Sequence, residues 1–366
     1  MTLTERVGAA VVAMLVLAAC GSAPEQASVP AVRVDLPAGS DGEVLAVTDG
    51  SVLVGVRRDR RPGLLRRAPD GTVSELPATP STGYGATASW YALTADGDRV
   101  LGIGGDNGGA HGNVRWSVWT GTTGTGVAEH TQAFSTFGGW GAGDLMGAVF
   151  TAAGPVLIGS WMGAAAGTDI AVWTATGDEW NRRSSAGTAL ASTRTTVNFA
   201  QAATRAPDGV LVVGWQAGTG GQAPVVWRGD GQQWTATPLP DGGKFGVALT
   251  ATCAAADCVV AGRSDGQLAL WRTVGGRWSR VAGLPPIPVG ERDPLAAPLV
   301  AGERIVQIAA DGDRVVAVDV TPSGSTVRPL AIPAGPVRGA AAAGPDAYVL
   351  VGAPAGLWQV PGLLDG

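Results

Sequence analysis

The chain has 366 residues and a net charge of −5; 45% of its residues are hydrophobic, 15% are charged and 57 are glycine. This composition is too apolar for a disordered chain and too rich in glycine for a helical protein. No basic run offsets the negative charge, so the sequence excludes the usual nucleic-acid-binding surface and we expect no nucleic-acid partner.

The first 19 residues are predicted to be a lipoprotein signal peptide. Arg6 precedes an apolar run of 13 residues, which is short for a membrane span and typical of an export signal. The run ends in Leu17-Ala18-Ala19-Cys20, which resembles the lipobox of bacterial lipoproteins. The resemblance implies cleavage before Cys20 and acyl chains such as palmitate on this residue, starting with a diacylglyceryl thioether. The alternative is an ordinary secretory signal followed by a chance cysteine.

Residues 20–30 are predicted to be the lipidated cysteine and a tether. Their polar, proline-containing sequence reaches roughly 30 Å when extended. No later segment has the pattern of a membrane span. We therefore expect residues 31–366 to form a globular body on the outer side of the cytoplasmic membrane, held there by the lipid.

Seven related hairpin sequences recur along residues 31–366. Each has a strand of small and β-branched residues, a turn rich in Asp, Gly or Pro, and a nearly continuous apolar second strand. The second strand ends at a glycine in every copy except the sixth, which has alanine. These positions are 35 to 55 residues apart, as in propeller blades: Gly55, Gly104, Gly159, Gly214, Gly262, Ala317 and Gly352.

A strand that is apolar on both faces must be covered on both faces, and each blade of a β-propeller packs between two neighbours. We therefore expect an all-β, seven-bladed β-propeller. The last copy leaves no room for a fourth strand, whereas residues 32–39 ("VRVDLPAG") carry the leucine-proline ending of the other fourth strands. We predict that this N-terminal strand completes the last blade and closes the ring as one monomeric domain.

Three hairpins between third and fourth strands contain tryptophan pairs. A two-residue turn at Asp230-Gly231 would place Trp227 opposite Trp234. We predict that all six rings pack in the core between blades and do not contact a ligand. The pairs are Trp173 and Trp180, Trp227 and Trp234, and Trp271 and Trp278.

These hairpins resemble the Asp-box (BNR) repeats of sialidase-like propellers, whose pattern is S-x-D-x-G-x-T-W. The match is partial, because Asp230 stands one residue too close to Trp234 and the other two hairpins lack an acid at that position. A weaker resemblance is to the tryptophan motifs of quinoproteins. Asp boxes are structural turns even in enzymes, so the resemblance implies a fold and not a reaction.

Cys253 and Cys258 flank a predicted tight turn centred on Ala255-Ala256. That turn places them opposite each other on paired strands, within disulfide distance. A zinc site would need two further ligands nearby, and the neighbouring sequence has none. We predict a disulfide bond, which suits a compartment outside the cytoplasm.

The sequence contains no recognisable catalytic constellation. Its three tyrosines include no tyrosine–glutamate pair of the sialidase type, and it has only two histidines, His111 and His130. We expect His111 to be a hydrogen-bonding loop residue. No phosphate-binding loop is present. We therefore expect neither a cofactor nor a metal site.

Long, glycine-rich connections in blades two to four are predicted to share one face of the ring, and loops on rigid scaffolds often carry binding residues. Aromatic rings there with nearby polar groups suit a sugar or a protein partner. The alternative is that these rings fill their own loops. The candidate residues are Trp140, Trp161, Trp215, Tyr84, Asp106, Asn107, Asp144 and Asp169.

Two functions remain open at this point. We expect a non-catalytic propeller that binds a protein or glycan partner at the cell surface. The alternative is a sialidase-like glycoside hydrolase whose site lies in the central pocket, which would require an acid, a base and an arginine cluster at the channel mouth.

Overall fold

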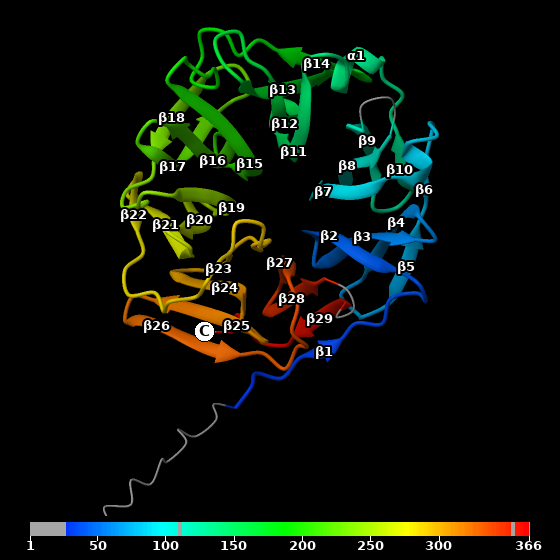
Figure 1. The fold of residues 1–366 in the computed structure, drawn as a ribbon. Helices are drawn as coiled ribbons and strands as arrows, with labels where there is room; N and C mark the ends of the chain where they lie inside the picture. Colours follow the sequence, from blue (N-terminus) through cyan, green and yellow to red (C-terminus); the bar gives the residue numbers. More distant parts are fainter. Residues whose placement is uncertain (1–26, 109–111, 353–355, 366) are drawn as a thin grey trace, which may run out of the picture.

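The computed structural model describes residues 27–108, 112–352 and 356–365, which form a ring of seven β-sheets (Figure 1). Each sheet is one blade, and its strands follow one another from the centre of the ring to the rim. The helical segments are short: the 3-10 helix η1 (Gly85–Thr87) and the α-helix α1 (Phe134–Phe137). The predicted all-β, seven-bladed propeller is confirmed.

Blades one to four are antiparallel, except that β6 adds to the rim of blade two in parallel with β10. Blade one contains β2 (Asp41–Thr48), β3 (Ser51–Arg58), β4 (Arg61–Arg67) and β5 (Val73–Leu76). Blade two contains β7 (Ser89–Asp96), β8 (Arg99–Asn107), β9 (Val114–Thr122), β10 (Gly126–Glu129) and β6 (Ala78–Thr79). Blade three contains β11 (Ala142–Thr151), β12 (Gly154–Met162), β13 (Thr168–Thr176) and β14 (Glu179–Arg183). Blade four contains β15 (Thr196–Ala206), β16 (Gly209–Gly218), β17 (Gly221–Gly229) and β18 (Trp234–Pro238).

Blades five to seven complete the ring. Blade five contains β19 (Gly246–Ala254), β20 (Asp257–Ser264), β21 (Gln267–Val274) and β22 (Arg277–Arg280). Blade six contains β23 (Leu299–Ala301), β24 (Arg304–Asp311), β25 (Arg314–Thr321) and β26 (Gly324–Pro329). Blade seven contains β27 (Val337–Ala343), β28 (Asp346–Val351), β29 (Gly356–Val360) and the N-terminal strand β1 (Val32–Arg33).

The N-terminal strand closes the ring as predicted, although it is shorter than residues 32–39. β1 pairs antiparallel with β29, and the Val34 amide donates to the carbonyl of Leu357 at 2.9 Å. The contacts of the propeller begin before the predicted boundary at residue 31, because the Val29 amide also donates to the Pro329 carbonyl of blade six at 2.7 Å. The N-terminal segment thus joins two blades.

The sixth recurring hairpin is not the first hairpin of its blade. A short strand, β23, precedes it and pairs with β24. The hairpin around Ala317 therefore consists of β24 and β25, the second and third strands. This shift of one strand explains why the spacing after Ala317 is only 35 residues.

The tryptophans of the third strands lie in the core between blades. Trp119, Trp173, Trp227 and Trp271 are among the largest fully buried side chains. Each indole N–H has an acceptor; the Trp173 and Trp227 N–H groups donate to the carbonyls of Thr136 and Ala189 at 2.9 and 3.1 Å. Trp180 and Trp234 are buried too, and Trp278 is partly buried against the same core. The predicted core role of the six paired tryptophans is confirmed.

The predicted register of one pair is wrong. Trp227 pairs with Ala236, and Trp234 pairs with Gly229. The loop between the strands contains residues 230–233, because an oxygen of the Asp230 carboxylate accepts the amides of Gln232 and Gln233 at 2.8 Å. These hydrogen bonds also lower the pKa of Asp230. Local side-chain bonding thus replaces the two-residue turn with a longer loop.

The recurring glycine of the second strand lies very close to the backbone of the first strand in three of the blades. In blades three, four and five, a Cβ at Gly159, Gly214 or Gly262 would lie 2.2, 1.9 or 2.1 Å from a backbone carbonyl oxygen of the first strand. The first strand has a β-bulge beside each of these glycines. Glycine is needed here because the bulged strand approaches so closely.

The same kind of bulge occurs in the first strand of every blade except blade six. A bulge redirects one side chain and is common near functional sites. None of the bulged side chains is buried. The first strands, to which these residues belong, lie nearest the centre of the ring (Figure 1). They are Glu43, Tyr91, Met146, Gln201, Leu249 and Arg338.

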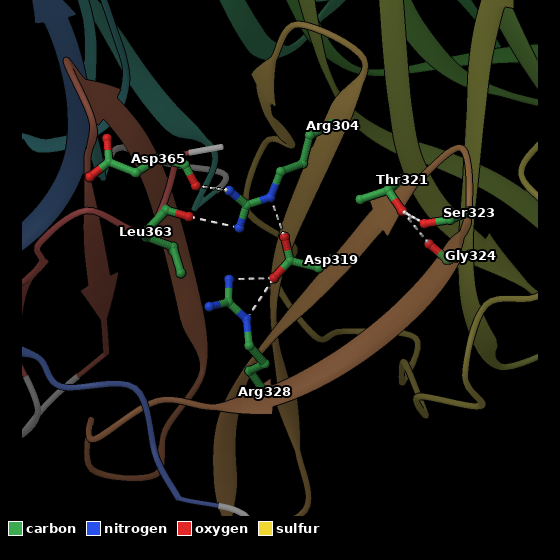
Figure 2. A network of polar contacts seen from close by, with 8 residues as sticks. All are labelled: Arg304, Asp319, Thr321, Ser323, Gly324, Arg328, Leu363 and Asp365. Atoms are coloured by element: carbon green, nitrogen blue, oxygen red, sulfur yellow. Dashed lines mark hydrogen bonds and ion pairs between the residues drawn. The ribbon is translucent and has the colours of Figure 1, made fainter.

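A buried ion network holds the C-terminal segment to blade six (Figure 2). The Asp319 side chain, which is 8% exposed, accepts from Arg304 Nε at 2.6 Å and also pairs with Arg328. The same Arg304 guanidinium donates to the carbonyls of Leu363 and Asp365, both at 2.8 Å. One carboxylate therefore orients the arginine that binds the chain end.

The predicted disulfide between Cys253 and Cys258 is confirmed. The two residues are paired partners on β19 and β20, and their Cα atoms are 4.0 Å apart. The turn between them consists of Ala255 and Ala256, and Ala255 adopts a positive φ of 50°.

Candidate functional site

The most exposed aromatic surface lies where blades two and three meet. Four of its side chains are apolar and strongly exposed: Tyr84 at 41%, Phe134 at 61%, Trp140 at 93% and Met162 at 54%. Arg115 lies among them on β9. We call these five residues the Arg115 patch. All of them except Arg115 belong to the connections that the sequence assigned to one face of the ring.

Stacking holds Arg115 in place. Its guanidinium carbon lies 4.7 Å from the centre of the Phe134 ring and 6.0 Å from that of Tyr84. A hollow of about 470 Å³ opens beside it, lined by Asn113, Arg115, Phe134, Gly139, Trp140 and Met162. A second hollow of about 330 Å³ shares Arg115 and Phe134 and extends to Tyr84, Glu129 and His130.

The loop that carries Tyr84 is fixed by a buried carboxylate. Glu129 on β10 accepts the amides of Ser81 and Thr82 at 2.6 and 2.8 Å and the Thr82 hydroxyl at 2.7 Å. At the other end of the loop, the Thr87 hydroxyl donates to Asp106 at 2.5 Å. These bonds order the loop without using the aromatic side chain.

The loop that carries Phe134 and Trp140 is anchored by one buried ring. Phe137 at the end of α1 is 7% exposed, and its ring centre lies 5.9 Å from that of Trp173. Gly139 follows with a φ of 94°, a left-handed conformation that favours glycine. The turn leaves the next residue, Trp140, in solvent. The exposed rings therefore project from a loop whose base is packed.

Five of the eight predicted binding residues gather at this face. Tyr84 and Trp140 belong to the patch, and Asp106 is the cross-strand partner of Arg115. Asn107 and Asp144 line a further hollow of about 320 Å³ that also includes Arg115. The structure adds Arg115, Phe134 and Met162, which the sequence analysis did not select because a single charge or apolar side chain at a strand end carries no pattern.

Three predicted residues lie apart from the patch. Trp161 is half-buried between Trp173 and Arg182, whose guanidinium carbon lies 4.3 Å from a Trp161 ring centre. Trp215 stacks on Phe199 in blade four, with ring centres 5.2 Å apart. These two rings fit the alternative that aromatic side chains fill their own loops.

The third residue, Asp169, is only 5% exposed. Its carboxylate accepts the Ser185 hydroxyl and the Ser192 amide, both at 2.7 Å. These bonds tie β13 to the connection that leads into blade four. Its carboxylate is therefore engaged within the protein.

The centre of the ring carries a tyrosine among acids. Tyr91, bulged from β7, is 46% exposed and meets Trp116 edge-on at 4.8 Å. Burial, followed by the charges of Asp144, Glu43 and Asp106, raises the pKa of the Tyr91 phenol. A raised pKa keeps the phenol protonated at neutral pH, whereas a tyrosine nucleophile needs the opposite shift.

The described residues contain no group of three or more His, Cys, Asp and Glu side chains placed to hold a metal ion. His130 bonds through Nε2 to the Thr120 hydroxyl. His111 lies outside the described residues. In the part of the chain that the structure describes, no helix is long and apolar enough to cross a membrane; the predicted signal peptide and Cys20 lie outside that part.

No protein-family model and no curated protein matches the chain. Solved structures match over most of its length. YCF48 from Cyanidioschyzon merolae has a TM-score of 0.55 at 12% identity, covering 92% of this chain and 99% of that chain. The polysaccharide lyase Uly1 has a TM-score of 0.53 at 11% identity, with 94% of each chain covered. The β-propeller domain of the Trilobed protease from Pyrococcus furiosus has a TM-score of 0.51 at 8% identity, covering 88% of this chain and 96% of that chain. At these identities the similarity shows the β-propeller fold alone.

Proposed function

We propose that the chain is a lipid-anchored β-propeller that binds a protein partner through the Arg115 patch, on the outer side of the cytoplasmic membrane. The observation that carries the binding role is the 93% exposure of Trp140 next to Phe134 and Met162. A tryptophan ring left in water does not gain the large favourable free energy of burial, and contiguous exposed apolar patches mark interaction sites.

The composition of the patch favours a protein partner. It contains one Tyr, one Arg, one Phe, one Trp and one Met, the residue types enriched at the cores of protein interfaces. Such aromatic anchors commonly contribute about 2 kcal/mol or more of binding free energy when truncated. The packed bases of the two loops support this role, because a partner then does not have to order them.

The anchoring part of the proposal is tested at Cys20. Cells that express the full chain are grown with a radioactive fatty acid. We expect the wild type to be labelled and Cys20→Ser to be unlabelled, because the serine oxygen cannot form the thioether. Labelling that persists in the serine variant contradicts the lipoprotein assignment.

The binding part is tested by crosslinking in intact cells. An aromatic photo-reactive amino acid, which keeps a ring at the position, replaces Trp140 in one variant and Val274 in another. Val274 is also exposed, at 53%, but it is the last residue of β21 in blade five. We expect a discrete crosslinked protein from position 140 and none from position 274. Adding Phe134→Ala is expected to weaken the first product. The same products from both positions, or none from position 140, contradict the proposal.

A matched stability measurement separates binding from folding. Trp140→Ala is expected to change the free energy of unfolding by no more than about 0.5 kcal/mol, because the ring is almost fully solvated. A larger loss would mean that the ring has a structural role.

A further inference from the structure

Arg115 has no charged partner in the part of the chain that the structure describes. Among the residues that the structure describes, its guanidinium makes the two ring contacts with Phe134 and Tyr84, and no hydrogen bond or ion pair is found for it. A guanidinium carries five N–H donors and stays charged at any physiological pH. These donors are therefore open to an acceptor from outside the protein.

An acidic side chain stands on the neighbouring strand, but no ion pair joins it to Arg115 in the described part of the chain. Asp106 is the cross-strand partner of Arg115, but its carboxylate accepts the Thr87 hydroxyl at 2.5 Å. Some exposed arginines have carboxylate partners, as Arg205 does with Asp96 and Arg228 with Asp208, whereas others in the described residues, such as Arg277, have none. Arg115 differs because it stands inside the exposed aromatic patch.

The two ring contacts leave the N–H edge of the guanidinium without an acceptor among the described residues. Rings this close restrict the rotation of the side chain, so less conformational entropy is lost when that edge binds an oxyanion. A carboxylate matches this edge with two parallel hydrogen bonds. The exposed rings and Met162 form an apolar wall on the same hollow. The geometry thus suits a carboxylate attached to an apolar segment.

The surrounding charge limits the ligand further. Asp144 and Asn107 line the hollow on the other side of Arg115, and Asp106 stands on the neighbouring strand. A glycan with evenly spaced carboxylates or sulfates would bring several negative charges against these two aspartates. A single carboxylate flanked by apolar side chains avoids that repulsion.

We infer that Arg115 selects partners with an acidic residue next to a large apolar residue, pairing with the carboxylate while the apolar side chain packs on Trp140 and Met162. This inference rests on the proposed function, because it specifies the chemistry of the partner at the same patch.

The test uses a displayed library of random 12-residue peptides selected on the full chain. We expect the selected peptides to contain Asp or Glu beside Phe, Leu or Trp and to lose affinity in Trp140→Ala. Arg115→Gln is expected to weaken them by about 10- to 100-fold, the effect of losing a hydrogen-bonded charge. Arg182→Gln is the matched control, since Arg182 also stacks on a ring but lies outside the patch; it should change affinity less than about twofold. Arg115→Glu is expected to shift selection to peptides with Lys or Arg.

The outcomes separate the inference from the proposed function. Peptides that depend on Trp140 but lack acids, or that bind Arg115→Gln equally well, overturn the inference and leave the patch as the binding surface. Peptides that ignore both substitutions contradict the proposed function too. An oligo-uronate that binds through Arg115 while no peptide is enriched overturns the inference in favour of a glycan.

Discussion

Replacing Gly214 by alanine is expected to destabilise the propeller although it adds a single methyl group. The new Cβ would lie 1.9 Å from the Phe199 carbonyl oxygen and 3.1 Å from the Ala200 Cα. These atoms belong to the backbone of β15, so no side-chain rotation relieves the overlap. Restoring a normal contact requires a strand displacement of roughly 1 Å in a close-packed core.

The expected cost follows from this geometry. Overpacking of a core costs about 1–3 kcal/mol, and a displaced strand also weakens its ladder bonds, each contributing about 1 kcal/mol. We therefore expect Gly214→Ala to lower the free energy of unfolding by about 3 kcal/mol, which corresponds to roughly 5 °C in melting temperature. The chain has 13 tryptophans, so fluorescence during urea unfolding measures the change directly.

Gly339→Ala is the matched control. Gly339 also lies in a first strand, β27, but the nearest atom to its added Cβ would be a side-chain carbon of Leu45 at 3.8 Å. This substitution is expected to be neutral or to stabilise by about 0.5 kcal/mol, because alanine has less freedom than glycine in the unfolded chain. Equal changes in the free energy of unfolding for the two variants would refute the explanation that the recurring glycine is needed because a bulged strand approaches it closely.

Asp319→Ala should lower the free energy of unfolding in urea by about 2–4 kcal/mol, because it leaves two arginines without their buried partner. Asp311→Ala, whose ion pair is more exposed, should lower it by less than about 0.5 kcal/mol. Similar losses in the two variants would show that the network of Figure 2 stabilises the protein no more than a surface ion pair does. Burial raises the pKa of Glu43, so its protonated form is favoured by folding, and the stability that it contributes at low pH is lost as pH rises through the folded-state pKa. Glu43→Gln should therefore reduce the fall in unfolding free energy as the pH rises above the ordinary pKa of glutamate, and an unchanged pH profile would contradict this. Deleting residues 32–39 should lower the free energy of unfolding by about 3–5 kcal/mol, since it removes the buried Val34 and the strand that pairs with β29. Deleting residues 22–26 should leave the melting temperature unchanged. Equal losses of stability from the two deletions would contradict ring closure by the N-terminal strand.

Repeated local patterns made the architecture predictable from the sequence. Seven apolar hairpins needed cover on both faces, and the missing fourth strand of the last blade matched the surplus strand at the N-terminus. The disulfide followed from a two-residue turn, which sets the cross-strand register by itself. Errors arose where a neighbouring segment changed the local outcome: β23 displaced the sixth hairpin by one strand, and Asp230 lengthened a turn through its own hydrogen bonds.

The proposed binding surface could be located in the sequence only as a region. Trp140, Trp161 and Trp215 all stand in or beside glycine-rich connections, and nothing in their immediate sequence distinguishes them. Their exposure differs because Trp161 meets Trp173 and Arg182, and Trp215 meets Phe199, whereas Trp140 follows a left-handed glycine into solvent.

The sequence by itself determined the class of fold, the closure of the ring, the disulfide and the face on which long loops gather. These properties depend on periodicity, turn chemistry and chain length, which are local. Only the tertiary structure decided which rings stay exposed and which charge stands among them. The five residues of the Arg115 patch come from two connections and two strand ends, and they meet only when the blades pack. Exposure and pairing are set by contacts between residues distant in the chain.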